Sequence, residues 1–165
     1  MKRPAILANA SASTPAEACP CGSGRTLVAC CGRWHAGELA DTPEALMRSR
    51  YAAFVLDVRP YLLATWHPDH RPAEIEPPEP GLKWLGLSVQ HSAVHPLGVG
   101  EAVPHWAQGL SGGPLQAWGE VAFVARYKIG GRAHRLVEHS VFARQGDAWR
   151  YVAASPDGAG RAAAD

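Results

Sequence analysis

The chain lacks long apolar runs, an excess of charge of either sign, and any cysteine outside one short segment. Its 165 residues carry 16 Lys and Arg against 15 Asp and Glu, for a net charge of +1. This balance argues against nucleic acid as a partner, because dedicated nucleic-acid binders are clearly basic. The longest apolar runs, such as Tyr51–Leu56, are far shorter than the roughly 20 residues of a membrane-spanning helix. The sequence therefore predicts no membrane span.

Recognisable catalytic motifs are also missing. There is no Gly-rich phosphate loop, no nucleophile elbow and no catalytic-triad pattern. At the N-terminus, Pro4 interrupts the start and Ala5–Ala8 is too short for the apolar segment of a secretory signal. We therefore expect residues 1–17 to form a disordered leader and the protein to be cytoplasmic. The length allows one compact domain with a small appendage.

All four cysteines fall between positions 19 and 31. Reducing cytosol disfavours disulfides. Cys30 and Cys31 are adjacent, and a single proline separates Cys19 from Cys21, so both pairs are poorly placed to bridge. Four thiolates suit the tetrahedral coordination of Zn²⁺. The segment predicts a structural zinc ion, and the alternative is a set of free or redox-active thiols.

The residues between the cysteines favour a metal knuckle over residues 18–36. Gly22 and Gly24 permit positive φ, so the chain can curl around an ion. Ser23 can add a hydrogen bond to a sulfur. Arg25 and Arg33 would offset the negative charge of four thiolates. The predicted ligands are Cys19, Cys21, Cys30 and Cys31.

The pattern Cys-Pro-Cys-Gly-Ser-Gly, then Cys-Cys-Gly with eight residues between the second and third cysteines, closely resembles the SEC-C motif. That motif is the zinc knuckle at the C-terminus of the bacterial translocase motor SecA. The resemblance implies zinc binding and docking onto a chaperone or the ribosome.

Residues 41–154 predict an α+β domain. Thr42 and Pro43 are suitable for a helix start, and an apolar face follows at helical spacing through Met47, Tyr51, Phe54, Val55 and Val58. A shorter helix is expected from Pro60 to Trp66, and then a loop from Arg71 to Gly81. Alternating patterns predict strands over 82–89, 121–129, 133–144 and 149–152, with turns at Gly130-Gly131 and Gly146-Asp147. We expect a long loop over 96–114 and a disordered tail over 155–165.

This order resembles the nuclear transport factor 2-like fold, a cone of helices packed on a curved antiparallel sheet. The segments "LMRSRYAAFVLDVRPYLLATWHP", "WLGL", "GEVAFVARY", "LVEHSVFAR" and "WRYV" resemble the bacterial YchJ family from Cys19 to about Val152. The resemblance implies the architecture and the metal site. It implies no particular activity.

A pocket is predicted between the helices and the sheet. Leu136, Glu138, Ser140 and Phe142 share one strand face, so Glu138 is expected inside and needs a partner. The available partners of Glu138 are Arg48, Arg50, Tyr51 and His67. The predicted apolar walls of the pocket are Trp66, Trp84 and Trp149. Glu138 or His67 could perform acid–base chemistry there, and the alternative is a purely structural Glu–Arg pair.

Three functions follow, of which we favour a non-enzymatic interaction module whose knuckle docks a protein or ribosomal partner. In that case Cys30→Ser should leave the second domain folded. The alternative is a small-molecule binder, or a lyase or isomerase, that uses the pocket. Nucleic-acid binding through the knuckle is the weakest. No spacing supports a second metal site among the histidines His67, His70, His91, His95 and His105, and Glu120 is expected to meet solvent.

Overall fold

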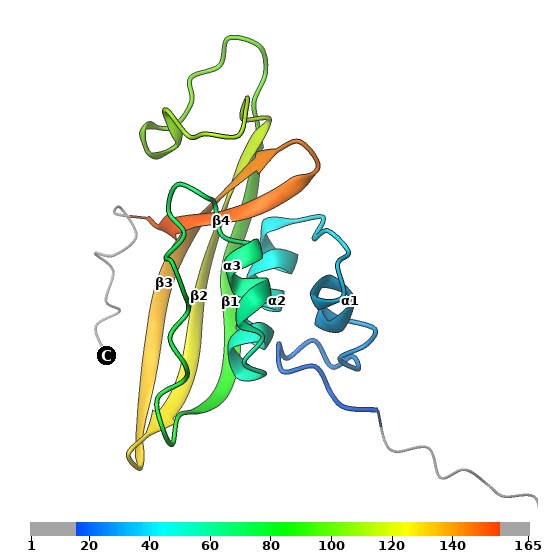
Figure 1. The fold of residues 1–165 in the computed structure, drawn as a ribbon, viewed down its shortest axis with the longest axis vertical. Helices are drawn as coiled ribbons and strands as arrows, with labels where there is room; N and C mark the ends of the chain where they lie inside the picture. Colours follow the sequence, from blue (N-terminus) through cyan, green and yellow to red (C-terminus); the bar gives the residue numbers. More distant parts are fainter. Residues whose placement is uncertain (1–15, 156–165) are drawn as a thin grey trace, which may run out of the picture.

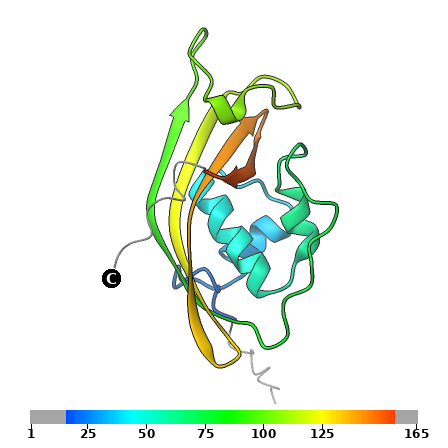
Figure 2. The same ribbon diagram turned by 90° about the vertical axis from the view of Figure 1, so that its left-hand side faces the viewer.

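In the computed structural model, which describes residues 16–155, helix α2 (Pro43–Val55) packs on the inner face of one curved antiparallel sheet, and helices α1 (Cys31–His35) and α3 (Arg59–Ala64) pack against α2 (Figures 1 and 2). The strands are β1 (Lys83–Pro96), β2 (Ala117–Ile129), β3 (Arg132–Gln145) and β4 (Ala148–Ala154), and η1 (His105–Ala107) is a short 3₁₀ turn. The α+β class is confirmed. None of the helices in this part of the chain is long and apolar enough to span a bilayer.

Helix α2 begins as its sequence predicts. The Thr42 side chain accepts a hydrogen bond of 3.1 Å from the amide of Ala45, and Pro43 occupies the first turn. The helix ends earlier than the predicted apolar face, because Asp57 adopts a positive φ of 55°. Val58 therefore lies outside α2, where it precedes α3.

The sheet has the order β1-β2-β3-β4, and its last two connections are the predicted glycine turns. Strand β1 is longer than the pattern indicates, since it continues to Pro96. Two irregularities, between Trp84 and Gly86 and between Val89 and His91, shift its register against β2. Such bulges break the alternation that a sequence pattern relies on.

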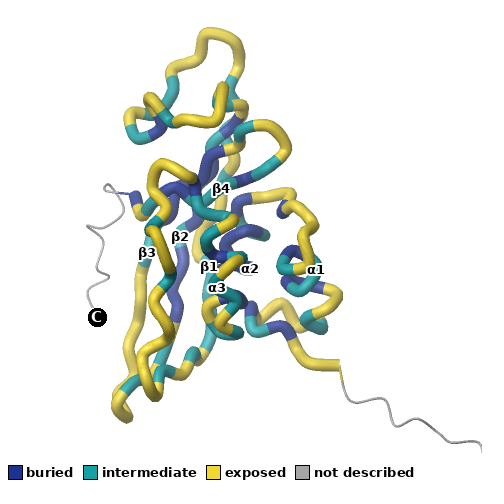
Figure 3. Tube along the Cα trace, in the orientation of Figure 1, coloured by how far each residue is buried: buried dark blue, intermediate teal, exposed yellow. Residues whose placement is uncertain are grey.

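The main core lies between α2 and the inner face of the sheet. Leu46, Tyr51, Phe123 and Phe142 are buried there. On the outer face, the segment predicted as a long loop over 96–114 packs Trp106 and Leu110 against Val141. Figure 3 shows buried residues concentrated beside the helices, whereas the far ends of β2 and β3 are mostly exposed.

The predicted leader and tail lie almost wholly outside the described residues. Only positions 16, 17 and 155 belong to both. Of these, the carbonyl of Glu17 accepts a hydrogen bond from Leu27, and the amide of Ser155 donates to the carbonyl of His139.

Candidate metal centre and pocket

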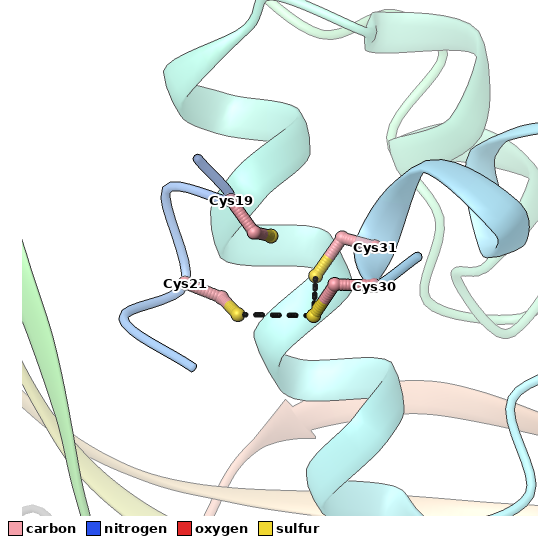
Figure 4. A group of neighbouring side chains, drawn as sticks. All are labelled: Cys19, Cys21, Cys30 and Cys31. Carbon is pink, nitrogen blue, oxygen red and sulfur yellow. Dashed lines mark hydrogen bonds between the residues drawn. The ribbon is translucent and has the colours of Figure 1, made fainter. Parts of the chain in front are cut away.

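The four cysteine side chains converge on one point (Figure 4). All four residues are buried, none is in a disulfide, and their Sγ atoms lie within 4.8 Å of one another. The Sγ of Cys30 is 3.6 Å from that of Cys21 and 4.0 Å from that of Cys31. Cys19 and Cys21 come from the first loop, while Cys30 and Cys31 lie at the start of α1.

These distances fit a tetrahedral metal ion. Zn–S bonds of about 2.3 Å place neighbouring sulfurs about 3.8 Å apart in a regular tetrahedron. The measured separations lie on both sides of that value. Among residues 16–155, this is the one group of metal-ligating side chains gathered so closely. The cluster can therefore hold a metal ion.

Glycines shape the loop that carries the cysteines. Gly22 and Gly24 have φ values of 78° and 76°, as the sequence predicts. Glycine is required at position 32 for a different reason, because a Cβ there would lie 2.7 Å from the carbonyl oxygen of Leu27. That carbonyl accepts hydrogen bonds from the amides of both Cys30 and Gly32. The close approach ties the start of α1 to the preceding turn and sets the direction of the last two sulfurs.

The electrostatics divide the cluster, because the pKa values of Cys21 and Cys30 are lowered whereas those of Cys19 and Cys31 are raised. A hydrogen bond from the Cys31 thiol lowers the pKa of Cys21 to about 4 and raises the pKa of Cys31. Burial alone would raise the pKa of Cys30, but the Ser23 hydroxyl, 3.1 Å away, and Arg25 lower it. Arg33, in contrast to Arg25, does not lower the pKa of Cys30. Its guanidinium pairs with Glu38 at 3.0 Å and lies over the Trp34 ring.

The knuckle is packed onto helix α2. The Nη1 of Arg48 donates to the carbonyl oxygen of Cys21 at 3.1 Å, and the Nε2 of His35 lies 2.8 Å from the carbonyl oxygen of Ser49. Trp34 is buried in the same core cluster as Leu46. The prediction that Arg48 belongs to the pocket is therefore wrong, since it lies on the side of α2 that faces the knuckle.

A cavity of about 290 Å³ lies between α2 and the inner face of the sheet. Of the residues predicted as partners or walls of the pocket around Glu138, Arg50, Tyr51, Trp66 and Trp84 line the cavity together with Glu138 itself. Most of the remaining lining is apolar or aromatic and is contributed by Met47, Phe54, Phe123, Ala125, Leu136, Phe142 and Tyr151.

Glu138 finds different partners from those predicted. Its Oε1 accepts hydrogen bonds from Ser140 Oγ at 2.7 Å and from the Tyr151 hydroxyl at 3.1 Å. Burial and the neighbouring Glu138 charge raise the pKa of Tyr151, so the hydroxyl remains a donor. The structural Glu–Arg pair is absent, because no Arg makes an ion pair with Glu138 in the described chain.

Arg50, 5% exposed, is the second charged group of the pocket. Its Nη1 donates to the Leu62 carbonyl and to Thr65 Oγ1, both at 2.8 Å. The guanidinium carbon lies 5.0 Å from the Trp66 ring centre and 4.6 Å from that of Tyr151. Burial lowers the pKa of Arg50 to about 10, and the two rings supply cation–π contacts.

Two other predicted pocket residues lie elsewhere. His67 is buried, and its Nε2 is 3.0 Å from Gln145 Oε1. Trp149 shares the inner face with Tyr151 but lies two residues before it on β4. Its Nε1 donates to the carbonyl of Asp41 at 3.2 Å. Neither residue lines the cavity.

Sequence reasoning missed a polar cluster on the outer face of the sheet. Glu120, expected to meet solvent, is contacted by His91, His95 and His139 at 3.7, 3.3 and 2.8 Å. Burial alone would raise the pKa of Glu120, but the hydrogen bonds from His95 and His139 lower it. The strand partners explain this grouping, because Glu120 neighbours His139 and the shifted β1 histidines across the sheet.

Comparisons with known families match nearly the whole described chain. The model of the YchJ middle NTF2-like domain matches residues 42–108 and 107–154, and the SEC-C motif matches residues 16–33. A UPF0225 protein of Bordetella parapertussis is 46% identical over 143 residues, which cover 85% of this chain and 92% of the relative. A UPF0225 protein of Methylibium petroleiphilum is 50% identical over 136 residues, covering 81% and 85%.

Two solved structures are similar. The solution structure of a SEC-C motif containing protein from Rhodopseudomonas palustris has a TM-score of 0.61 at 28% identity and covers 83% of this chain and 96% of that one. The crystal structure of a SEC-C motif containing protein from Psychrobacter arcticus has a TM-score of 0.57 at 22% identity, with coverage of 82% and 80%. The second likeness supports the fold alone.

Proposed function

We propose that this chain, which belongs to the YchJ family and carries a SEC-C motif, binds one structural Zn²⁺ and uses the resulting knuckle to dock a protein or ribosomal partner. The ligands would be Cys19, Cys21, Cys30 and Cys31. Zinc supplies no redox chemistry and favours a closed four-thiolate site, so its contribution here is structural. The observation that carries the proposal is the convergence of the four buried sulfurs at separations suited to a tetrahedral ion.

The two sides of the knuckle differ in a way that supports docking. Its inner side, with Trp34 and the cysteines, is buried against α2. Its outer side exposes Arg25, Val28 and Ala29, and Val28 is 82% exposed. A large aliphatic side chain held out by a rigid, metal-braced turn is a suitable centre for a small contact surface, because a partner can bury it without reordering the loop.

The docking proposal is tested by Val28→Asp. We expect this variant to keep its metal content and melting temperature but to lose co-sedimentation with purified ribosomes, or binding to the protein partner identified by crosslinking. The matched control is Val99→Asp, which places the same charge on another fully exposed valine in the loop after β1. Equal binding by wild type and Val28→Asp would refute docking through this side of the knuckle.

A second function is favoured by the pocket. We propose that the cavity binds a small aromatic or apolar molecule that carries one polar group. In support, Glu138 is fixed by Tyr151 and Ser140 among aromatic walls, with Arg50 buried beside the same Tyr151 ring. A carboxylate placed in this way can accept a proton, which is the chemistry of a lyase or isomerase.

The pocket proposal is tested by thermal-shift screening with small aromatic amines and carboxylic acids. A ligand should raise the melting temperature of the wild type, and Glu138→Gln should remove that rise while changing the unliganded melting temperature little. Glu120→Gln is the control, because it makes the same change on the outer face of the sheet. A ligand that stabilises Glu138→Gln as strongly as the wild type would exclude a role for the carboxylate.

A further inference from the structure

Four cationic side chains gather on the outer face of the sheet at its far end. Arg126 on β2 lies directly opposite Arg135 on β3, and Lys128 on β2 lies directly opposite Lys83 on β1. Arg126 and Lys128 share a face because they are two residues apart on one strand. All four are exposed. This end of the β2–β3 hairpin projects beyond the helices (Figures 1 and 2).

In the part of the chain that the structure describes, no acidic group forms an ion pair with these four cations, which we call the cationic end. The sequence from Val121 to Val137 contains no Asp or Glu. Within residues 16–155, the ion pairs formed by Arg and Lys join Arg33, Arg48 and Arg59 to acids, and none includes the cationic end. The glutamates of the loop before β1, among them Glu79, make no ion pair with Lys83.

In each of the two cross-strand pairs, both side chains therefore carry a positive charge. Side chains directly opposite on adjacent strands approach to about 5 Å, and like charges placed there destabilise a sheet. The isolated protein retains this repulsion. An extended polyanion that crosses the two pairs would remove it, since each bound phosphate neutralises one cation and releases counterions.

The edge of β3 beside the cationic end favours a nucleic acid over other polyanions. Strand β4 pairs with the Ser140–Gln145 part of β3, and Ser155 bonds the carbonyl of His139, so within residues 16–155 the stretch of β3 from Arg132 to Glu138 has no strand partner on that side. On the inner face of this open stretch the rings of Tyr127 and His134 are stacked, 5.1 Å apart at 18°, and His134 is exposed. Bases of a single strand stack on such aromatic platforms.

We propose that the cationic end binds the phosphate backbone of single-stranded RNA, with a base reaching the Tyr127–His134 pair around the open edge of β3. The net charge of +1 conceals this surface, because acids elsewhere in the chain cancel cations that the fold gathers in one place. RNA is the abundant single-stranded polyanion inside cells. Binding here is independent of the metal centre and of the pocket.

The test is fluorescence anisotropy with a labelled single-stranded oligouridine over a range of KCl concentrations. If four phosphates are contacted, the slope of log K against log salt should be about −2.8, and it should fall to about −1.4 for Arg126→Gln/Arg135→Gln, because each contact to a single strand contributes about 0.7. This variant should melt at the same temperature as the wild type or above it, since a repulsive pair is removed.

Arg71→Gln/Arg144→Gln is the matched control, because it removes two exposed arginines elsewhere and gives the same net charge. It should bind like the wild type. Equal losses in both variants, binding that is insensitive to salt, or absence of wild-type binding at low salt would each overturn the proposal. Binding to phosphatidylglycerol vesicles without binding to the oligouridine would also overturn it, and would assign the surface to anionic lipid instead.

Discussion

If the knuckle holds the proposed zinc, its removal will lower the melting temperature of the protein by about 20 °C or more. Structural zinc contributes on the order of 10 kcal/mol to small knuckles, and in a domain of this size each kcal/mol shifts the melting temperature by about 2–4 °C. The knuckle shares one core with α2, where Trp34 and Leu46 belong to the same buried cluster. The sequence-based expectation is that Cys30→Ser leaves the second domain folded, and the shared core adds the expectation that this domain becomes less stable.

The measurement combines native mass spectrometry with thermal denaturation of Cys30→Ser and of chelator-treated wild type. The wild type should carry one zinc per chain and the variant none. Ala29→Ser is the control, because it adds a hydroxyl at the exposed neighbouring position and should retain both metal and stability. Wild-type protein that contains no metal and readily forms disulfides would show instead that the four thiols are redox-active.

Phe142→Ala will lower the free energy of unfolding by about 3–5 kcal/mol, the usual loss when a buried aromatic side chain is truncated. Phe142 is 0% exposed, and its ring packs edge-on against Tyr151 at 5.8 Å. Because Tyr151 holds Glu138, we also expect weaker binding in the pocket. Urea denaturation measures the change in stability.

The control for Phe142→Ala lies on the other face of the same strand. Val137 is 52% exposed, so Val137→Ala should change the free energy of unfolding by no more than about 0.5 kcal/mol. Equal losses of stability in the two variants would contradict the expectation that the burial of Phe142, in contrast to Val137, determines the loss.

The parts of the fold that follow from local rules could be predicted from the sequence. Thr42 and Pro43 marked the start of α2, and Gly130-Gly131 marked the β2–β3 turn, because capping and positive φ depend on a few adjacent residues. The inward face of β3 also followed from simple alternation, which holds where that strand is regular.

The parts that depend on register or on long-range packing could not be predicted. His91 and His95 lie beside Glu120 because Ala93, between them on β1, is the strand partner of Glu120, and the sequence of a single strand contains no signal for that register. Arg48 lies one residue after Met47, which faces the pocket, yet helical rotation turns it toward the Cys21 carbonyl. Assigning it required the position of the knuckle, which only the three-dimensional structure provides.

The contact between the knuckle and β1 has a consequence for aggregation. β1 is an edge strand, and open edges can pair with strands of other molecules. Its bulges limit the regular stretch between them to Gly86–Val89, and the knuckle lies against that stretch, since a Cβ on Gly22 would be 3.9 Å from the Leu87 carbonyl oxygen. An ordered knuckle therefore covers part of the edge near Leu87, on the short regular stretch between the two bulges. If the proposed zinc orders the knuckle, chains that lack the ion would expose this stretch and would self-associate through their backbone more readily.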